Sequence, residues 1–157
     1  MTRAAVWGLL VGLLVAGAAC SPGERAQAIR YDAFARRVSD GTVDVYWNCT
    51  RPESGLLRLE GAVNSPVVPG AIHDVELTLY GVDGADRDVS RAQGHTADYQ
   101  VFTMSPSPFR LDLRLVGSEV RFDLRYQYRG SNGGGNSDNG GQSAFVSNLA
   151  RDICRGL

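Results

Sequence analysis

Apolar and polar residues alternate along most of the chain between residues 42 and 128. The clearest stretches are 109–115 and 120–128, in which every second residue is apolar and most of the others are Arg or Asp. A period of two predicts β-strands that bury one face. The same period predicts strands over 42–49, 57–63 and 75–79, a short strand around Val89 and a strand over 99–104. About seven short strands separated by turns predict a mainly β fold, an antiparallel sandwich.

The two clearest strands are expected to form the centre of the core. Their apolar faces carry Phe109, Leu111, Leu113 and Leu115 in the first strand, and Val120, Phe122, Leu124, Tyr126 and Tyr128 in the second.

Charges leave the pairing of these two strands open. A hairpin that turns at Gly117-Ser118 places Arg114 opposite Arg121, an unfavourable pair of like charges. A turn at Val116-Gly117 instead places Asp112 opposite Arg121 and keeps the apolar face intact, because the register slips by an even number of residues. The third possibility is that the strands belong to different sheets.

Residues 20–41 are expected to form a helix or a flexible tether ahead of the sandwich. Ser21 and Glu24 have the spacing of a helix capping box. Tyr31, Ala35 and Val38 then recur at helical spacing. A helix is favoured, since Tyr31 and Phe34 would have no use in a linker.

A glycine-rich loop and a short C-terminal helix are expected at the end of the chain. Residues 130–141 contain six glycines, a composition that predicts a long mobile loop. Ser143 can then cap a helix over 143–155 that Gly156 ends. Phe145, Leu149 and Ile153 would line one side of that helix.

The first nineteen residues are typical of a signal peptide. Arg3 supplies a positive charge, residues 6–15 are apolar, and small residues at 17–19 precede Cys20. This arrangement resembles the lipobox of bacterial lipoproteins, in which the cysteine is lipidated and becomes the mature N-terminus. The alternatives are an ordinary secretory signal cut near Ala19 and an uncleaved membrane anchor. Lipidation is favoured, because the apolar run is shorter than the roughly 20 residues that span a bilayer.

Without residues 1–19 the chain has the size of one domain, over 42–157, behind the anchored segment 20–41. All 16 cationic side chains are Arg, balanced by 17 Asp and Glu. The absence of Lys excludes a phosphate-binding P-loop lysine, a Schiff-base lysine and a Ser-Lys dyad. The balanced charge argues against nucleic-acid binding, which needs a continuous basic patch.

Three cysteines suggest one lipid site and one disulfide. If Cys20 carries the lipid, Cys49 and Cys154 are the only possible intramolecular pair in an oxidising compartment. Two separate buried thiols are the alternative.

No catalytic or cofactor motif is found. A serine, histidine and aspartate triad lacks a nucleophile-elbow sequence. His73 and His95 have no recognisable third metal ligand, so no metal site is predicted. Residues 133–141 only faintly resemble calcium-binding nonapeptides, which repeat their aspartates periodically.

One surface could collect positive charge. It would carry Arg110, Arg114, Arg121, Arg125 and Arg129, if these face the same way. Interleaved acidic residues favour a salt-bridged, solvated sheet face over a site for phosphate, lipid headgroups or acidic glycans.

A family resemblance lies between residues 56 and 115. The segments VELTLYGVDG (75–84), GAVN (61–64) and MSPSPFRLDL (104–113) resemble the FxLYD-type immunoglobulin-like domain of bacterial envelope lipoproteins. Leu79-Tyr80 match the Leu-Tyr pair of that family, whereas Leu77 replaces its Phe and Gly81 its Asp. The resemblance implies an immunoglobulin-like sandwich and supplies no catalytic residues.

Two functional classes follow. The first is a non-catalytic, lipid-anchored envelope module that binds or assembles with an envelope protein through a sheet edge or an Arg-bearing face. The second is an accessory enzyme or metallochaperone that uses His73 or His95. No pattern identifies a cofactor or a small-molecule ligand. Ser21 is not the aspartate of inner-membrane retention signals, so the periplasmic side of the outer membrane is expected in a Gram-negative cell.

We expect radiolabelled palmitate to be incorporated into the wild-type protein and not into Cys20→Ala, because the cysteine thiol is the acceptor of the lipid. Equal labelling of the two proteins would contradict lipidation at this residue.

Overall fold

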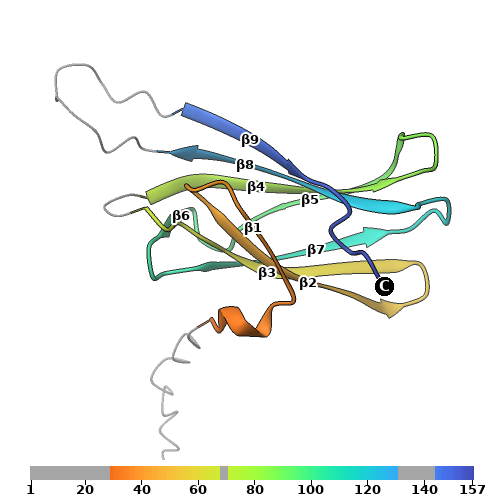
Figure 1. Ribbon diagram of the computed structural model, residues 1–157, viewed down its shortest axis with the longest axis horizontal. Helices are drawn as coiled ribbons and strands as arrows, with labels where there is room; N and C mark the ends of the chain where they lie inside the picture. Colours follow the sequence, from red (N-terminus) through yellow and green to blue (C-terminus); the bar gives the residue numbers. More distant parts are fainter. Residues whose placement is uncertain (1–28, 68–70, 131–143) are drawn as a thin grey trace, which may run out of the picture.

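The computed structural model describes residues 29–67, 71–130 and 144–157, and two antiparallel sheets pack face to face in it (Figure 1). The first sheet has the order β1-β2-β3-β7, with β1 (Arg36–Ser39), β2 (Asp44–Glu53), β3 (Leu56–Asn64) and β7 (Ser107–Arg114). The second has the order β5-β4-β8-β9, with β5 (Asp88–His95), β4 (Ala71–Val82), β8 (Arg121–Gly130) and β9 (Ala144–Ala150). The short strand β6 (Gln100–Phe102) pairs with the start of β4. The predicted mainly β, antiparallel sandwich is therefore confirmed.

Strand order gives the sandwich its immunoglobulin-like character. In immunoglobulin domains strands A, B and E lie together in one sheet, and C′, C, F and G lie in the other. The orders β2-β3-β7 and β5-β4-β8-β9 reproduce these two sets.

Within the described residues no helix is long and apolar enough to cross a membrane.

The core lies between the sheets and is built from the alternating positions. Every second residue of β7 is buried and its neighbours are exposed, as the sequence pattern predicts. The side chains that fill the core include Trp47, Leu57, Leu59, Leu77, Leu79, Phe109, Leu111, Leu113, Phe122, Leu124 and Tyr126.

The two clearest strands belong to different sheets, which was the third of the possibilities. β7 pairs with β3 and places Asp112 opposite Arg58, so that the like-charge conflict of a hairpin never arises. β8 lies between β4 and β9 in the other sheet. Val120, expected in the core, is instead 68% exposed. The reason is that it lies in the crossover before β8 begins, where its N–H donates to the Val82 carbonyl.

The predicted N-terminal helix is wrong for the described part of 20–41. A single 3-10 turn, η1 (Tyr31–Ala33), is followed by the short strand β1. The helical spacing of apolar residues predicts a helix here, but β1 instead pairs with β2. Val38 lies opposite Val45 and is partly buried against the core. Tertiary pairing therefore outweighs local helical spacing. Residues 20–28, including Cys20, and the signal peptide 1–19 lie outside the described residues.

The predicted C-terminal helix is also wrong. Residues 144–150 form β9, which pairs with β8, and turns follow to the end of the chain. Phe145 and Leu149 point to solvent, whereas Val146 and Ala150 pack against the core. The period is therefore two, and the match to a helix came from four-residue spacing that both structures share. Of the glycine-rich loop 130–141, only Gly130, the last residue of β8, is described.

A disulfide joins Cys49 of β2 to Cys154 in the turn after β9, with the Cα atoms 5.7 Å apart. It therefore links the first sheet to the tail of the second, rather than to a helix. The bonded residues are 105 positions apart, so the chain-entropy model assigns the bridge about 4–5 kcal/mol. The Trp47 indole N–H donates to the Ile153 carbonyl at 3.1 Å and reinforces the same junction.

Side-chain truncation on the two faces of β7 should have different effects on stability. Leu113→Ala should lower the free energy of unfolding by about 2–5 kcal/mol, because Leu113 is fully buried and its removal leaves a cavity. Arg114→Ala, on the exposed face next to it, should change that free energy little. Denaturant unfolding of both variants measures the difference, and a larger loss for Arg114→Ala would contradict the assigned faces.

Candidate functional site

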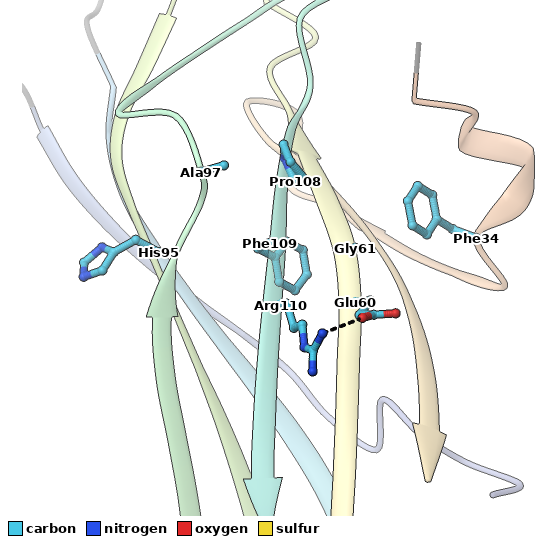
Figure 2. A pocket seen from close by; sticks show the side chains of 8 residues that line it. All are labelled: Phe34, Glu60, Gly61, His95, Ala97, Pro108, Phe109 and Arg110. Atoms are coloured by element: carbon cyan, nitrogen blue, oxygen red, sulfur yellow. Dashed lines mark ion pairs between the residues drawn. The ribbon is translucent and has the colours of Figure 1, made fainter. Parts of the chain in front are cut away.

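An open groove of about 500 Å³ lies on the β3–β7 side of the sandwich (Figure 2). It has the size of many binding pockets and a mainly apolar lining. Its lining residues come from the N-terminal segment, β3, β7 and the end of β5: Phe34, Glu60, Gly61, His95, Ala97, Pro108, Phe109 and Arg110.

Gly61 and Phe109 form the floor of the groove. They are opposite each other in the β3–β7 pair. A Cβ atom at Gly61 would lie 2.7 Å from two carbons of the Phe109 ring and 2.0 Å from the Tyr46 carbonyl oxygen. Only glycine therefore lets the ring lie flat against β3, and this close approach is the structural reason for a glycine inside the strand.

The N-terminal segment forms one wall and is held by a single amide. The Asn48 side chain donates to the Ala33 carbonyl at 3.0 Å and accepts from the Ala35 N–H at 2.7 Å. Phe34, between these two residues, has extended backbone and points toward the groove (Figure 2). Tyr46 packs beneath the segment, with its ring centroid 6.2 Å from that of Phe34. The wall is therefore fixed to β2 on both sides of Phe34.

Charged side chains border the groove on the outer face of the first sheet. Arg110 lies 3.6 Å from the Glu60 carboxylate and 2.9 Å from that of Asp112. Arg58 binds the same Asp112 at 2.7 Å. The hydrogen bonds from Arg58 and Arg110 lower the pKa of Asp112 to about 2. The rim is therefore a ladder of paired charges around an apolar floor.

The two histidines do not form a metal site with other potential ligands. His95 ends β5 at the border of the groove, and its ring points away from Phe109 (Figure 2). His73 lies in β4 beside Tyr99, with ring centroids 6.0 Å apart. Across residues 29–67, 71–130 and 144–157, no three His, Cys, Asp or Glu side chains are grouped to hold a metal ion.

The five arginines do not share one surface, so the less favoured possibility of a collected positive charge is not realised. Arg110 and Arg114 lie on the outer face of the first sheet, whereas Arg121, Arg125 and Arg129 belong to β8 in the second. The physical reason is the crossover between β7 and β8, which carries the second group to the opposite side of the sandwich. Of these residues, Arg110, Arg121 and Arg129 are in ion pairs, as the salt-bridged alternative predicts.

Arg125 has a different partner. Together with Arg91 it stacks on Tyr80 of β4, at 5.3 and 5.7 Å from the ring centroid. This cation–π arrangement buries the ring and explains part of the Arg content of the second sheet.

The groove was not identified from the sequence. The sequence predicts Phe109 in the core, and the residue is indeed buried. It predicts Phe34 in a helix, whereas Phe34 has extended backbone. The signal that could have pointed to the site is Gly61, an isolated glycine within a strand pattern, because such a glycine marks a close approach. Cys49 and Cys154 are structural, and Cys20 and residues 133–141 lie outside the described residues.

No protein-family model and no curated protein matches the chain. Similar solved structures include the GAE domain of GGA2p from Saccharomyces cerevisiae, 6% identical over 78% of this chain and 99% of that chain, with a TM-score of 0.49. The yeast GGA1 GAE domain is 12% identical over 73% of this chain and 93% of that chain, with a TM-score of 0.44. Neither similarity bears on function.

The charge ladder predicts a pH dependence. Because the pKa of Asp112 falls from 3.8 to about 2 on folding, its carboxylate stabilises the fold above pH 3.8, and this contribution is lost as the pH falls toward about 2. A carboxyl NMR titration should give a midpoint near 2 in the wild type, and Arg58→Gln should raise it toward 3.8. Arg125→Gln, in the other sheet, serves as the control and should leave the midpoint unchanged. A wild-type midpoint at the ordinary value would contradict the ladder.

Proposed function

We propose that this protein is a non-catalytic binding or assembly module, lipid-anchored to the bacterial cell envelope, that holds an apolar side chain from an extended segment of an envelope protein. The observation that carries this proposal is the groove over Gly61 and Phe109, which is apolar, open and rimmed by charges already paired with each other.

The N-terminal segment of this chain supplies a template for the occupant. Phe34 is an aromatic side chain on extended backbone, and it already forms one wall of the groove. The adjoining floor of Phe109 and Pro108 can take a second large side chain beside it. Burial of such a side chain supplies most of the affinity in sites of this kind, while the polar rim sets its orientation.

Export and anchoring are supported by three features. The segment ending at Cys20 resembles a lipobox, and the sequence of residues 75–84 resembles that of the FxLYD-type domain of envelope lipoproteins. The Cys49–Cys154 disulfide suits an oxidising compartment outside the cytoplasm. We place the module on the periplasmic side of the outer membrane in a Gram-negative cell.

An accessory enzyme or metallochaperone that uses His73 or His95 is the alternative. It would need one of these histidines to face the groove together with a carboxylate or a second ligand. The His95 ring points away from Phe109, and Glu60, on the other side of β7, is engaged by Arg110 (Figure 2). These observations favour the binding module.

The groove can be tested by filling it. Random peptides displayed on phage, selected on the purified full-length protein, should converge on extended sequences with an aromatic or large aliphatic residue. Ala97→Trp places an indole in the groove from an exposed loop position and should weaken the selected peptides at least about tenfold, a change of 1.4 kcal/mol in binding free energy.

Ala85→Trp is the matched control, because Ala85 is also exposed but lies in the turn between β4 and β5. It should bind the peptides as the wild type does. Peptides that bind both tryptophan variants equally well would contradict a site in the groove.

A further inference from the structure

We propose that one end of the sandwich rests on the lipid bilayer, with the side chains of Val67, Tyr99, Phe102 and Met104 in the headgroup region. We call these four residues the apolar end. The inference rests on the proposed lipid anchor and adds to it an orientation of the domain on the membrane.

The four side chains are exposed by 42%, 68%, 46% and 91%, in chain order. They lie on two adjoining segments, because the Thr103 hydroxyl donates to the Val67 carbonyl at 2.8 Å and Phe102 pairs with Ala71 at the start of β4. Exposed apolar residues that gather in this way mark interaction sites, whereas scattered ones do not.

Met104 is not explained by local structure. Its φ is +64°, in the left-handed region that favours glycine or asparagine, and its side chain is almost fully exposed. Neither backbone preference nor packing within the described residues therefore accounts for a methionine there. A flexible apolar side chain held out at the tip of a turn suits insertion into a soft apolar medium.

Charge divides the two ends of the sandwich. No charged residue occurs in 65–67 or in 99–106. Asp98, next to Tyr99, accepts a hydrogen bond from the Ser107 hydroxyl at 2.8 Å and is thus engaged within the domain. The opposite end is rich in charge: Arg51 and Glu53 lie at the end of β2, and the connections there carry Asp83, Asp86, Arg87 and Glu119. The end that carries β6 (Figure 1) also has Asp74 and Arg129 beside Tyr99, and these two side chains are paired with each other at 3.7 Å. It therefore brings fewer charges to the interface than the opposite end does.

The anchor reaches the domain on the matching side. Eight residues, 21–28, separate Cys20 from the first described residue, so the lipid lies at most about 30 Å from Ile29. Phe34 shares the groove with Ala97 and Pro108, and the Ala97 N–H donates to the Pro108 carbonyl at 2.8 Å. Tyr99 follows two residues later. The tether therefore enters beside the loop that leads to the apolar end.

Aromatic residues with a polar group favour the bilayer interface, where the ring is in an apolar layer and the hydroxyl stays hydrated. Tyr99 has this character, and Phe102 and Met104 add apolar area. The lipid supplies the tether, and these side chains supply a second, weaker contact that fixes the orientation of the domain on the bilayer.

The test places a tryptophan reporter at each end of the lipidated full protein. Phe102→Trp and Val116→Trp are compared in phosphatidylethanolamine–phosphatidylglycerol vesicles with brominated acyl chains, after subtraction of the signal from buried Trp47. Val116 is exposed and lies in the connection between β7 and β8, at the far end. The reporter at 102 should lose most of its fluorescence, and the one at 116 should lose little. Met104→Glu should restore the fluorescence at 102.

Mass spectrometry and sedimentation distinguish the possible outcomes of this test. The mass of the purified protein shows whether Cys20 carries a lipid, so failure of the anchor is scored apart from failure of the contact. A lipidated protein whose reporters at 102 and 116 are quenched equally overturns the inference and leaves the anchored module intact. Self-association in sedimentation that Met104→Glu abolishes would assign the apolar end to a second copy of the chain, and would also overturn the inference.

Discussion

The crossover between β7 and β8 is the constraint on which the arrangement of the sandwich depends. Two neighbouring amphipathic strands with the same Arg and Asp pattern would oppose like charges as a hairpin, and placing them in different sheets removes that conflict. β7 can then pair its charges with Arg58 and Glu60 on β3. β8 becomes an inner strand of the second sheet and needs a neighbour on each side, so the end of the chain becomes β9 rather than a helix.

The sequence predicts those features in which local pattern and burial agree. Alternation in 109–115 and 120–128 identifies two strands and, apart from Val120, their buried faces, because one face of each meets the other sheet. The sequence pattern gave the wrong secondary structure where contacts with distant segments determine the backbone conformation. Tyr31, Ala35 and Val38 have helical spacing, yet the Asn48 amide and the pairing of β1 with β2 hold the chain extended from Phe34 onward. The pairing of Cys49 with Cys154 followed from counting thiols, which is insensitive to the secondary structure around them.

The candidate site could not be predicted from the sequence, because its residues come from segments that are far apart in the chain and lie together only in the folded protein. Phe34, Gly61, Ala97 and Phe109 are unremarkable in their own contexts, and they meet only once β3 and β7 are paired. Gly61 makes the difference, since any side chain there would push the Phe109 ring away from the strand. A residue that looks like a flaw in the strand pattern thus creates the apolar floor.

The positions of the groove and of the apolar end are compatible with a single orientation of the proposed lipid-anchored domain. Both involve the connection between β5 and β7, which includes β6; its Ala97 lines the groove, and it then carries Tyr99, Phe102 and Met104 as this loop's outer side chains. If this loop's far side rests on lipid, the groove opens beside the membrane surface rather than away from it. A partner would then present its apolar residue from a segment close to the same bilayer, which restricts the search for occupants to membrane-proximal regions of envelope proteins. Restricting both molecules to one surface raises their effective concentration, so that a shallow groove suffices for binding.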